Sequence, residues 1–481
     1  MLVWLIILIT ALMLYGWWHS VKPLPSGLNF SGMEHPVAAD RITFLADLTT
    51  ASENGERITD QHIFPTLFTL IDQAERYILL DFFLLNDHSG REAGHNAKPL
   101  AALLMNHLLA RKQQVPDLVV DILTDPINSA YNGAEAKVLN RLRTAGINII
   151  ETNLDPLRDS NPLYSVWWRL LLRWIPDWGH YLPHPFDADG AKVSLASWLR
   201  LINFKANHRK TAVIDQGDTW VSLVTSANPH GASRNHSNVG LLVVDDQLAA
   251  DLYLSEQAVA RMSGGQLHPL PELSKVDNIP ESSHRISVRV ITEERIRTEI
   301  CKAIDASAQG DRIRMAMFYL ADRHIIEALL NAGRRGTSIE LILDPNRDAF
   351  GYEKNGVPNR PVAAELIKKS AGQIAIRWYQ THGEQFHSKL ILVEHTDGDS
   401  SVFLGSANLT RRNIGNYNLE TNLLLKGPAT APPIGVINDY FSALRDNRER
   451  PYTRPYPAFA DPSPLKYFQY RVQEAIGLGT F

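Results

Sequence analysis

The sequence predicts an α/β protein of two homologous halves, each with a mainly parallel or mixed sheet flanked by helices, and a membrane helix at the amino terminus. Three observations predict it: the chain opens with an uncharged apolar segment, one series of strand and helix patterns occurs twice, and the same polar motif ends both series. With 481 residues, 44% of them hydrophobic, the chain can form one large globular unit or two domains. A net charge of -4 gives no overall attraction to nucleic acid, which is not an expected partner.

The opening segment, residues 2–18, has no charged side chain and approaches the roughly 20 residues that cross a bilayer. The pair Trp17 and Trp18 at its end is typical of a membrane interface. A cleaved signal peptide is the alternative, but the segment lacks a basic start and a clear small-x-small cleavage site. We therefore expect residues 1–18 to be a retained single-pass anchor, followed by a linker over residues 19–42.

Three Asn-x-Ser/Thr acceptors, at Asn29, Asn235 and Asn408, bear on the compartment. Asn408 belongs to a motif to which we assign chemistry below, so a glycan there would disable the protein. This favours a bacterial inner membrane over a eukaryotic lumen.

A repeat of strand and helix patterns divides the rest of the chain. In each half a buried strand precedes a helical pattern, a second apolar strand ends in Asp-Pro, and another helix precedes a third strand. This alternation indicates parallel sheets covered by helices. The strands are expected at 77–84, 118–123 and 147–151 in the first half and at 312–319, 339–343 and 374–379 in the second. The domains are expected at 43–263 and 285–450, with a linker over 264–284 and a Pro- and Tyr-rich tail over 451–481.

The first half carries an extra segment, about residues 155–200, which contains five of the ten tryptophans. The pair Asn161-Pro162 indicates a helix start, and Pro176 ends the pattern. An apolar face then alternates with Arg169 and Arg173, which is typical of a helix over 162–175 in a lipid interface; the alternative is a lid packed on the protein itself. The residues of the expected apolar face are Leu163, Trp167, Leu170, Leu171, Trp174 and Ile175.

A His-x-Lys motif lies on an apolar strand in each half and precedes a Ser-Ala-Asn turn. Side chains two apart on a strand share a face, so each histidine lies beside a fixed positive charge. Imidazole can attack phosphorus, while ammonium and amide donors hold the other phosphate oxygens. One copy would indicate no more than a surface strand, but two copies in matching contexts favour shared chemistry. The motif residues are His208, Lys210, Asp215, Ser226 and Asn228 in the first half and His387, Lys389, Glu394, Ser406 and Asn408 in the second.

On these motifs the sequence resembles the phospholipase D superfamily, whose signature is His-x-Lys-x4-Asp twice, each followed by a Gly-Ser-x-Asn-like turn. The resemblance covers residues 43–445. It implies two halves around a pseudo-two-fold axis with both motifs in one cleft, a phosphohistidine on one histidine, a second histidine that protonates the leaving group, and no metal or cofactor. A single chain is the expected active unit.

The resemblance assigns six residues to the phosphate and gives other motif positions a structural or supporting role. Glu394 replaces the aspartate of the second motif and Thr225 replaces a glycine of the first turn; both positions, like Asp215, are expected to be structural. Ser226 and Ser406 are supporting candidates. The six phosphate residues are His208, Lys210, Asn228, His387, Lys389 and Asn408.

A further departure concerns the group that orients each imidazole. About thirty residues past each histidine, family members often have an acid; the second half has Glu420, whereas the first has Asn238. A carboxylate raises the pKa of a neighbouring histidine and a neutral amide does not. On this ground we expect His208 to be the nucleophile and His387, backed by Glu420, to be the general acid. The alternative for Glu420 is an exposed charge at a strand end.

Membrane tethering and the tryptophan-rich helix favour a phospholipid substrate. Transfer to a lipid alcohol, as in a cardiolipin synthase, is expected ahead of hydrolysis to phosphatidic acid. The alternative is a membrane-tethered nuclease for single strands, which predicts a basic, aromatic-lined groove. A non-catalytic binding protein is disfavoured because both motifs keep their His, Lys and Asn.

Overall fold

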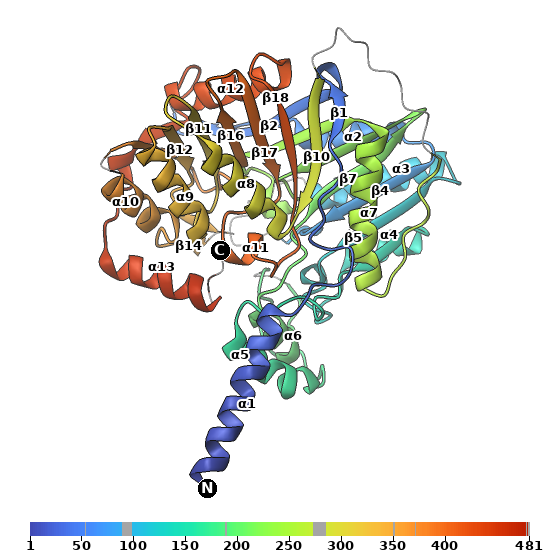
Figure 1. The fold of residues 1–481 in the computed structure, drawn as a ribbon. Helices are drawn as coiled ribbons and strands as arrows, with labels where there is room; N and C mark the ends of the chain where they lie inside the picture. The colour runs from blue at the N-terminus through green and yellow to red at the C-terminus, as the bar shows by residue number, and fades with distance from the viewer. Residues whose placement is uncertain are drawn as a thin grey trace.

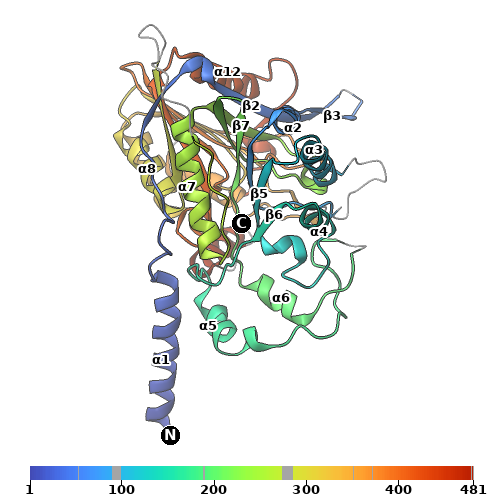
Figure 2. The ribbon, with the colours of Figure 1, turned by 90° about the vertical axis from the view of Figure 1, so that its right-hand side faces the viewer.

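The computed structural model describes residues 1–52, 54–88, 99–187, 190–272, 285–349, 352–370, 372–477 and 479. Most of the expected linker, residues 273–284, lies outside this part of the chain. Two large sheets with their helices form the body, and one helix, α1 (Leu2–Val21), projects from it (Figure 1, Figure 2).

The first half forms an eight-stranded sheet in the order β3-β2-β9-β8-β7-β4-β5-β6. Its strands β4, β5 and β6 coincide with the three expected ones. The bounds are β2 (Ile42–Ala51), β3 (Arg57–Asp60), β4 (Tyr77–Phe82), β5 (Val119–Thr124), β6 (Asn148–Glu151), β7 (Lys210–Gln216), β8 (Thr219–Thr225) and β9 (Asn238–Val244).

The second half forms a nine-stranded sheet in the order β1-β10-β18-β17-β16-β11-β12-β15-β19. Its inner seven strands repeat the order of β2-β9-β8-β7-β4-β5-β6, so the sequence repeat is a repeat of topology. Strand β1 comes from the expected amino-terminal linker and β19 from the tail. The bounds are β1 (His35–Ala38), β10 (Arg285–Thr292), β11 (Arg312–Met317), β12 (Ser338–Leu343), β15 (Ile374–Tyr379), β16 (Lys389–Glu394), β17 (Asp399–Gly405), β18 (Thr421–Pro428) and β19 (Thr453–Pro455).

Both sheets are mixed rather than mainly parallel. Among the strands of the described residues, only β4, β5 and β6, with their counterparts β11, β12 and β15, pair in parallel. The motif strands β7 and β16 are antiparallel to their neighbours on both sides. The reason is local: Gly217, at φ +66°, lies in a two-residue turn between β7 and β8, and so short a connection can join only antiparallel strands.

The two sheets share one core. Val224 and Leu241 of the first sheet belong to the same cluster of buried side chains as Leu404 and Leu423 of the second. Helices α7 (Asp246–Met262) and α12 (Pro432–Asp446) add side chains to this shared core. Separate clusters join the first sheet to α2 (Ile63–Gln73), α3 (Leu100–Gln114) and α4 (Lys137–Thr144), and the second sheet to α8 (Glu294–Ala306), α9 (Arg323–Arg334) and α10 (Asn359–Lys369). The remaining helices of the second half and tail are α11 (Arg411–Ile414) and α13 (Pro464–Ile476) (Figure 1).

Helix α1 is long and apolar enough to cross a membrane, and only 6% of its most apolar window is buried in the protein. It continues to Val21, three residues past the expected end of the anchor. The insertion lies beside its carboxyl end and contains α5 (Pro162–Leu170), a 3-10 turn η3 (Leu172–Trp174) and α6 (Leu195–Ile202) (Figure 2). The expected helix over 162–175 begins at Pro162, capped by Asn161, as predicted. Its expected length is wrong, because Leu171 leaves helical geometry at φ -129° and the helix ends at Leu170.

Candidate active site

His208 and His387 each lie two residues before a central strand, β7 or β16, and both line one cavity of about 670 Å³. The two asparagines of the Ser-Ala-Asn turns, Asn228 and Asn408, line the same cavity. The halves thus bring both motifs to one place, as the resemblance implies.

Backbone hydrogen bonds cross between the halves at the two histidines. The N–H of His208 donates to the carbonyl of Leu419 at 2.9 Å, and the N–H of His387 donates to the carbonyl of Ser237 at 2.8 Å. Leu419 directly precedes Glu420, and Ser237 directly precedes Asn238. Each histidine is therefore held against the orienting residue of the other half.

This crossing corrects the expected pairing of Glu420 with His387. His208 Nδ1 lies 2.8 Å from Oε1 of Glu420, whereas His387 Nδ1 lies 3.0 Å from Oδ1 of Asn238. Spacing along the sequence pairs each orienting group with the histidine of its own half. The reciprocal backbone bridges exchange the partners, so the pKa argument built on the assumed pair no longer holds. Glu420 is also fully buried, which excludes the alternative of an exposed strand-end charge.

Polar neighbours fix both orienting groups. Glu420 accepts hydrogen bonds from the hydroxyl of Ser406 and the amide of Asn413, while the hydroxyl of Ser226 donates to Asn238 at 3.1 Å. Burial alone would raise the pKa of Glu420, but His208, which becomes charged only in the acid range near pH 4, and its hydrogen bond hold that pKa below its ordinary value. Glu420 is therefore a carboxylate at neutral pH, and the two serines hold matching positions in the two halves.

Both imidazoles are neutral near pH 7. Burial lowers the pKa of His208 to about 4, although Glu420 opposes the shift. Burial and the charge of Lys389 lower the pKa of His387 well below its ordinary value. A neutral ring carries one proton, and an acceptor at Nδ1 places it there. The Nε2 atom of each ring is then left as the nitrogen with a free lone pair.

The two lysines lie beneath the histidines in matching environments. Lys210 Nζ donates to the carbonyl of His208 at 2.7 Å, and Lys389 Nζ donates to that of His387 at 2.8 Å. Each ammonium also lies over an aromatic ring, Phe83 at 5.2 Å or Phe318 at 5.1 Å. Burial lowers the pKa of Lys210 to about 7 and that of Lys389 well below its ordinary value.

The motif asparagines differ in their bonding. Oδ1 of Asn228 accepts a hydrogen bond from the backbone N–H of Leu84 at 3.3 Å. This bond does not use the amide nitrogen of Asn228, which is the atom that could donate to a phosphate oxygen. Oδ1 of Asn408 is buried and has no hydrogen-bond partner among the described residues. An unpaired buried carbonyl oxygen is costly, and Oδ1 of Asn408 needs a donor such as the hydroxyl of an alcohol, whereas only its amide nitrogen can donate to a phosphate oxygen.

The last positions of the motifs are structural, as expected. Asp215 accepts backbone N–H groups of Arg76 at 2.9 Å and Tyr77 at 2.8 Å. Glu394 forms ion pairs with Arg312 and Arg314, both at 2.8 Å. Each acid lies near the end of its strand that is remote from the histidine. Neither lines the cavity.

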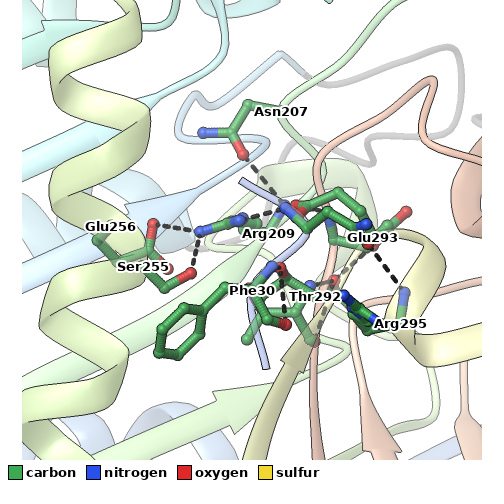
Figure 3. A network of polar contacts seen from close by, with 12 residues as sticks. Phe30, Asn207, Arg209, Ser255, Glu256, Thr292, Glu293 and Arg295 are labelled. Atoms are coloured by element: carbon green, nitrogen blue, oxygen red, sulfur yellow. Dashed lines mark hydrogen bonds and ion pairs between the residues drawn. The ribbon is translucent and has the colours of Figure 1, made fainter. Parts of the chain in front are cut away.

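A buried network connects Arg209, the residue after His208, to the start of the second half (Figure 3). Arg209 follows His208, is fully buried, and pairs with Glu256 on α7 at 3.2 Å and with Glu293 before α8 at 2.7 Å. Glu293 also accepts the N–H of Glu420 at 3.2 Å and that of Asn29, just past α1, at 2.7 Å. Glu293 therefore joins three distant parts of the chain behind the site.

Several site residues escaped the sequence reasoning. Phe83 and Phe318 pack on the rings of His208 and His387 with centroids 4.9 Å and 5.0 Å apart, and the alignment of the two halves could have found them. Asp125 and Asp344, seen only as ends of strands, accept the N–H groups of Asn207 and Phe386, both at 2.7 Å. His236 and Lys205 also line the cavity, and no repeated spacing marks them.

The insertion supplies one wall of the cavity, and this wall is largely apolar. It faces the histidines across the space. Its members include Pro183, Phe186, Trp198, Leu201 and Phe204. Among the described residues no group of three or more His, Cys, Asp or Glu side chains is arranged to hold a metal ion.

Residues 300–444 match a family model described as cardiolipin synthase, PLD-like domain. No curated protein sequence matches the chain. The crystal structure of phosphatidylserine synthase from Haemophilus influenzae Rd KW20 shares the fold, with a TM-score of 0.57 and 13% identity over 94% of this chain and 97% of that chain. Nuc, a phospholipase D family member from Salmonella typhimurium, is 21% identical over 36% of this chain and 98% of that chain, with a TM-score of 0.27. The resemblance to the phospholipase D superfamily and the α/β fold class are thus confirmed.

Proposed function

We propose that this chain, with its phospholipase D-like fold, is a membrane-anchored phosphodiesterase that transfers a phosphatidyl group from one phospholipid to a lipid alcohol. The observation that carries the proposal is the pair His208 and His387, which line one cavity from two halves of the chain. One chain supplies both groups and is a complete active unit. Helix α1 is its single-pass anchor, in a bacterial inner membrane.

The chemistry follows from the protons on the two rings. Nε2 of His208 attacks phosphorus, the bond from phosphorus to the leaving alcohol breaks, and His387 gives that oxygen its Nε2 proton. The acceptor alcohol then attacks the phosphohistidine, returns a proton to His387 and frees His208. Lys210, Lys389 and the motif asparagines hold the remaining phosphate oxygens.

The role of nucleophile goes to His208 because of Glu420. The carboxylate keeps the proton of His208 on Nδ1 and offsets the positive charge that the ring gains when Nε2 bonds to phosphorus. His387 has only the neutral Asn238, so its imidazolium is a stronger acid and releases its proton more readily. The negative charge of a bound phosphodiester favours the protonated form of His387 before the reaction begins.

The apolar wall of the cavity favours a lipid. Leu84 and Ile127 face it together with Phe186, Leu201 and Phe204 of the insertion. A single-stranded nucleic acid would instead need a basic groove that follows its backbone. Acyl chains or glycerol backbones fit an apolar wall, because their burial there removes hydrocarbon from water.

The test is turnover by purified full-length enzyme in vesicles that contain labelled phosphatidylglycerol, compared with His208→Ala and His387→Ala. We expect a transfer product with two phosphatidyl groups from the wild type and none from either variant. If phosphatidic acid were the only product, the reaction would be hydrolysis and not transfer. Shortening of single-stranded DNA without lipid turnover would overturn the proposal in favour of a nuclease.

A further inference from the structure

The outer face of the insertion exposes an unusual set of large apolar side chains. Trp167 is 50% exposed and Trp178 76% exposed, and the whole set comes from one short stretch of the chain. Five of its members, from Leu163 to Trp174, belong to the face that the sequence predicts to be apolar, and the protein leaves these side chains exposed. Its members are Leu163, Trp167, Leu170, Leu171, Trp174, Trp178 and Tyr181.

This face is fixed to α1. A Cβ atom on Gly16 would lie 2.7 Å from the side chain of Val166, so α1 and α5 touch closely near the carboxyl end of α1. Asp159 donates its N–H to the carbonyl of His19 at 3.0 Å, and Arg158 donates to that of Lys22 at 2.7 Å. Figure 1 and Figure 2 show α5 beside this end of α1 and below both sheets, and Figure 2 shows α6 farther from α1. If α1 spans the bilayer, the insertion lies at its surface.

The cations of the insertion are placed as an interface requires. Arg169 turns inward and pairs with buried Asp159 at 2.7 Å, so it leaves the outer face free of that charge. Arg173 lies over the ring of Trp174 at 4.6 Å, where its guanidinium can reach phosphate groups while the indole contacts hydrocarbon. Trp, Arg and Leu on one surface are typical of a segment seated among lipid head groups.

We propose that the outer face of the insertion lies in the bilayer beside α1, and that the cavity takes its lipid directly from the bilayer along the wall that the insertion provides. A later part of the insertion, with Trp198, Leu201 and Phe204 on and just after α6, lines the cavity. The segment expected as one helix over 162–175 thus carries the exposed apolar face, while α6 supplies the wall over the cavity. The lipid route rests on the proposed function; the seating of the face does not.

The seating is tested without activity, on full-length chain in vesicles of phosphatidylethanolamine and phosphatidylglycerol. The single cysteine is removed by Cys301→Ser, and a fluorophore is attached at Trp174→Cys or, as the matched control, at Val436→Cys. Val436 is 52% exposed on α12, at the end of the body away from α1 (Figure 1). We expect spin-labelled lipid to quench the label at 174 and iodide to quench the label at 436. Equal quenching of both labels by iodide would overturn the proposal.

The route is tested by turnover of two substrates. The double variant Trp174→Ser with Trp178→Ser should lose about tenfold in turnover of long-chain phosphatidylglycerol in vesicles, because apolar contact with the bilayer is lost. Turnover of monomeric short-chain phosphatidylglycerol should not change, and Val436→Ser should change neither. An equal loss on both substrates would mean a structural defect and would overturn the route. If the wild type turns over neither lipid, the proposed function fails, and the quenching result still decides the seating.

Discussion

Nδ1 of His208, in the first half of the chain, lies 2.8 Å from Oε1 of Glu420, in the second half. The matching contact of His387 is made with the neutral amide of Asn238 at 3.0 Å. The two histidines therefore have matching backbone contacts, but only His208 has a charged group at Nδ1. This asymmetry leads to the first two predictions.

Glu420→Gln removes the charge behind His208 and keeps an acceptor of the same shape. We expect kcat to fall on the order of 10²-fold, because the positive phosphohistidine loses its compensating charge. KM should change little, since Glu420 does not line the cavity. Single-turnover kinetics with labelled phosphatidylglycerol would measure the step, and unchanged formation of the phosphoenzyme would contradict the role of Glu420.

Asn238→Asp places a carboxylate against His387. The pKa of His387 lies well below its ordinary value, and a carboxylate at Nδ1 raises it. Because the general acid must start protonated, the pH above which kcat/KM declines should move upward. A profile of kcat/KM against pH for wild type and variant measures this shift. If the pH above which kcat/KM declines moved downward instead, His387 would not be the general acid.

The roles of the histidines can also be separated by the leaving group. With a phosphatidyl ester of p-nitrophenol, departure needs no proton, so His387→Ala should still release nitrophenol in a burst and hold a phosphoenzyme. His208→Ala should release none. A phosphohistidine trapped at residue 387 would reverse the assignment.

The affinity for phosphodiester should depend on pH through Lys210. Burial lowers its pKa to about 7, so the free enzyme loses this ammonium charge as pH rises through 7. The charged form binds phosphate, and KM should therefore be constant below about pH 7 and rise above it. Lys210→Met should show a high KM with a weaker dependence on pH. A wild-type KM that falls above pH 7 would contradict the sign.

Arg209→Met should strongly destabilise the fold, because Glu256 and Glu293 would be left as buried carboxylates without their cation. We expect a loss of about 3–5 kcal/mol in the free energy of unfolding, measured by urea denaturation in detergent. The matched control is Arg143→Met, which breaks a half-exposed pair with Glu151 at 2.6 Å and should cost less than about 1 kcal/mol. Similar losses for both variants would show that the buried network has no special weight.

The fold was predictable where the pattern of apolar segments is local. Strands such as β4 and β11 are short, apolar and repeated, so their positions agree with the structure. The choice between a mainly parallel and a mixed sheet was left open, because it depends on connections such as the two-residue turn at Gly217 rather than on apolar content. The break of the insertion helix at Leu171 likewise leaves no mark in the periodicity.

The residues of the site were predictable from the sequence, but the hydrogen-bond partner of each histidine was not. Repetition marks the His, Lys and Asn of each motif, and all six lie around one place. The partner of each imidazole depends on bridges such as that between His208 and Leu419, which connect segments more than two hundred residues apart. Sequence distance from each histidine suggested the wrong partner because it takes no account of this crossing.

The exchange of orienting groups has a consequence for the evolution of the chain. A lone half would lack the group that orients its imidazole, because that group belongs to the other half. Two associated copies of such a half would orient each other's imidazoles, and after fusion a substitution such as Asn for an acid in one copy alters the imidazole of the other. Specialisation of the two rings thus needed a change at only one position, in the copy that does not carry the affected ring.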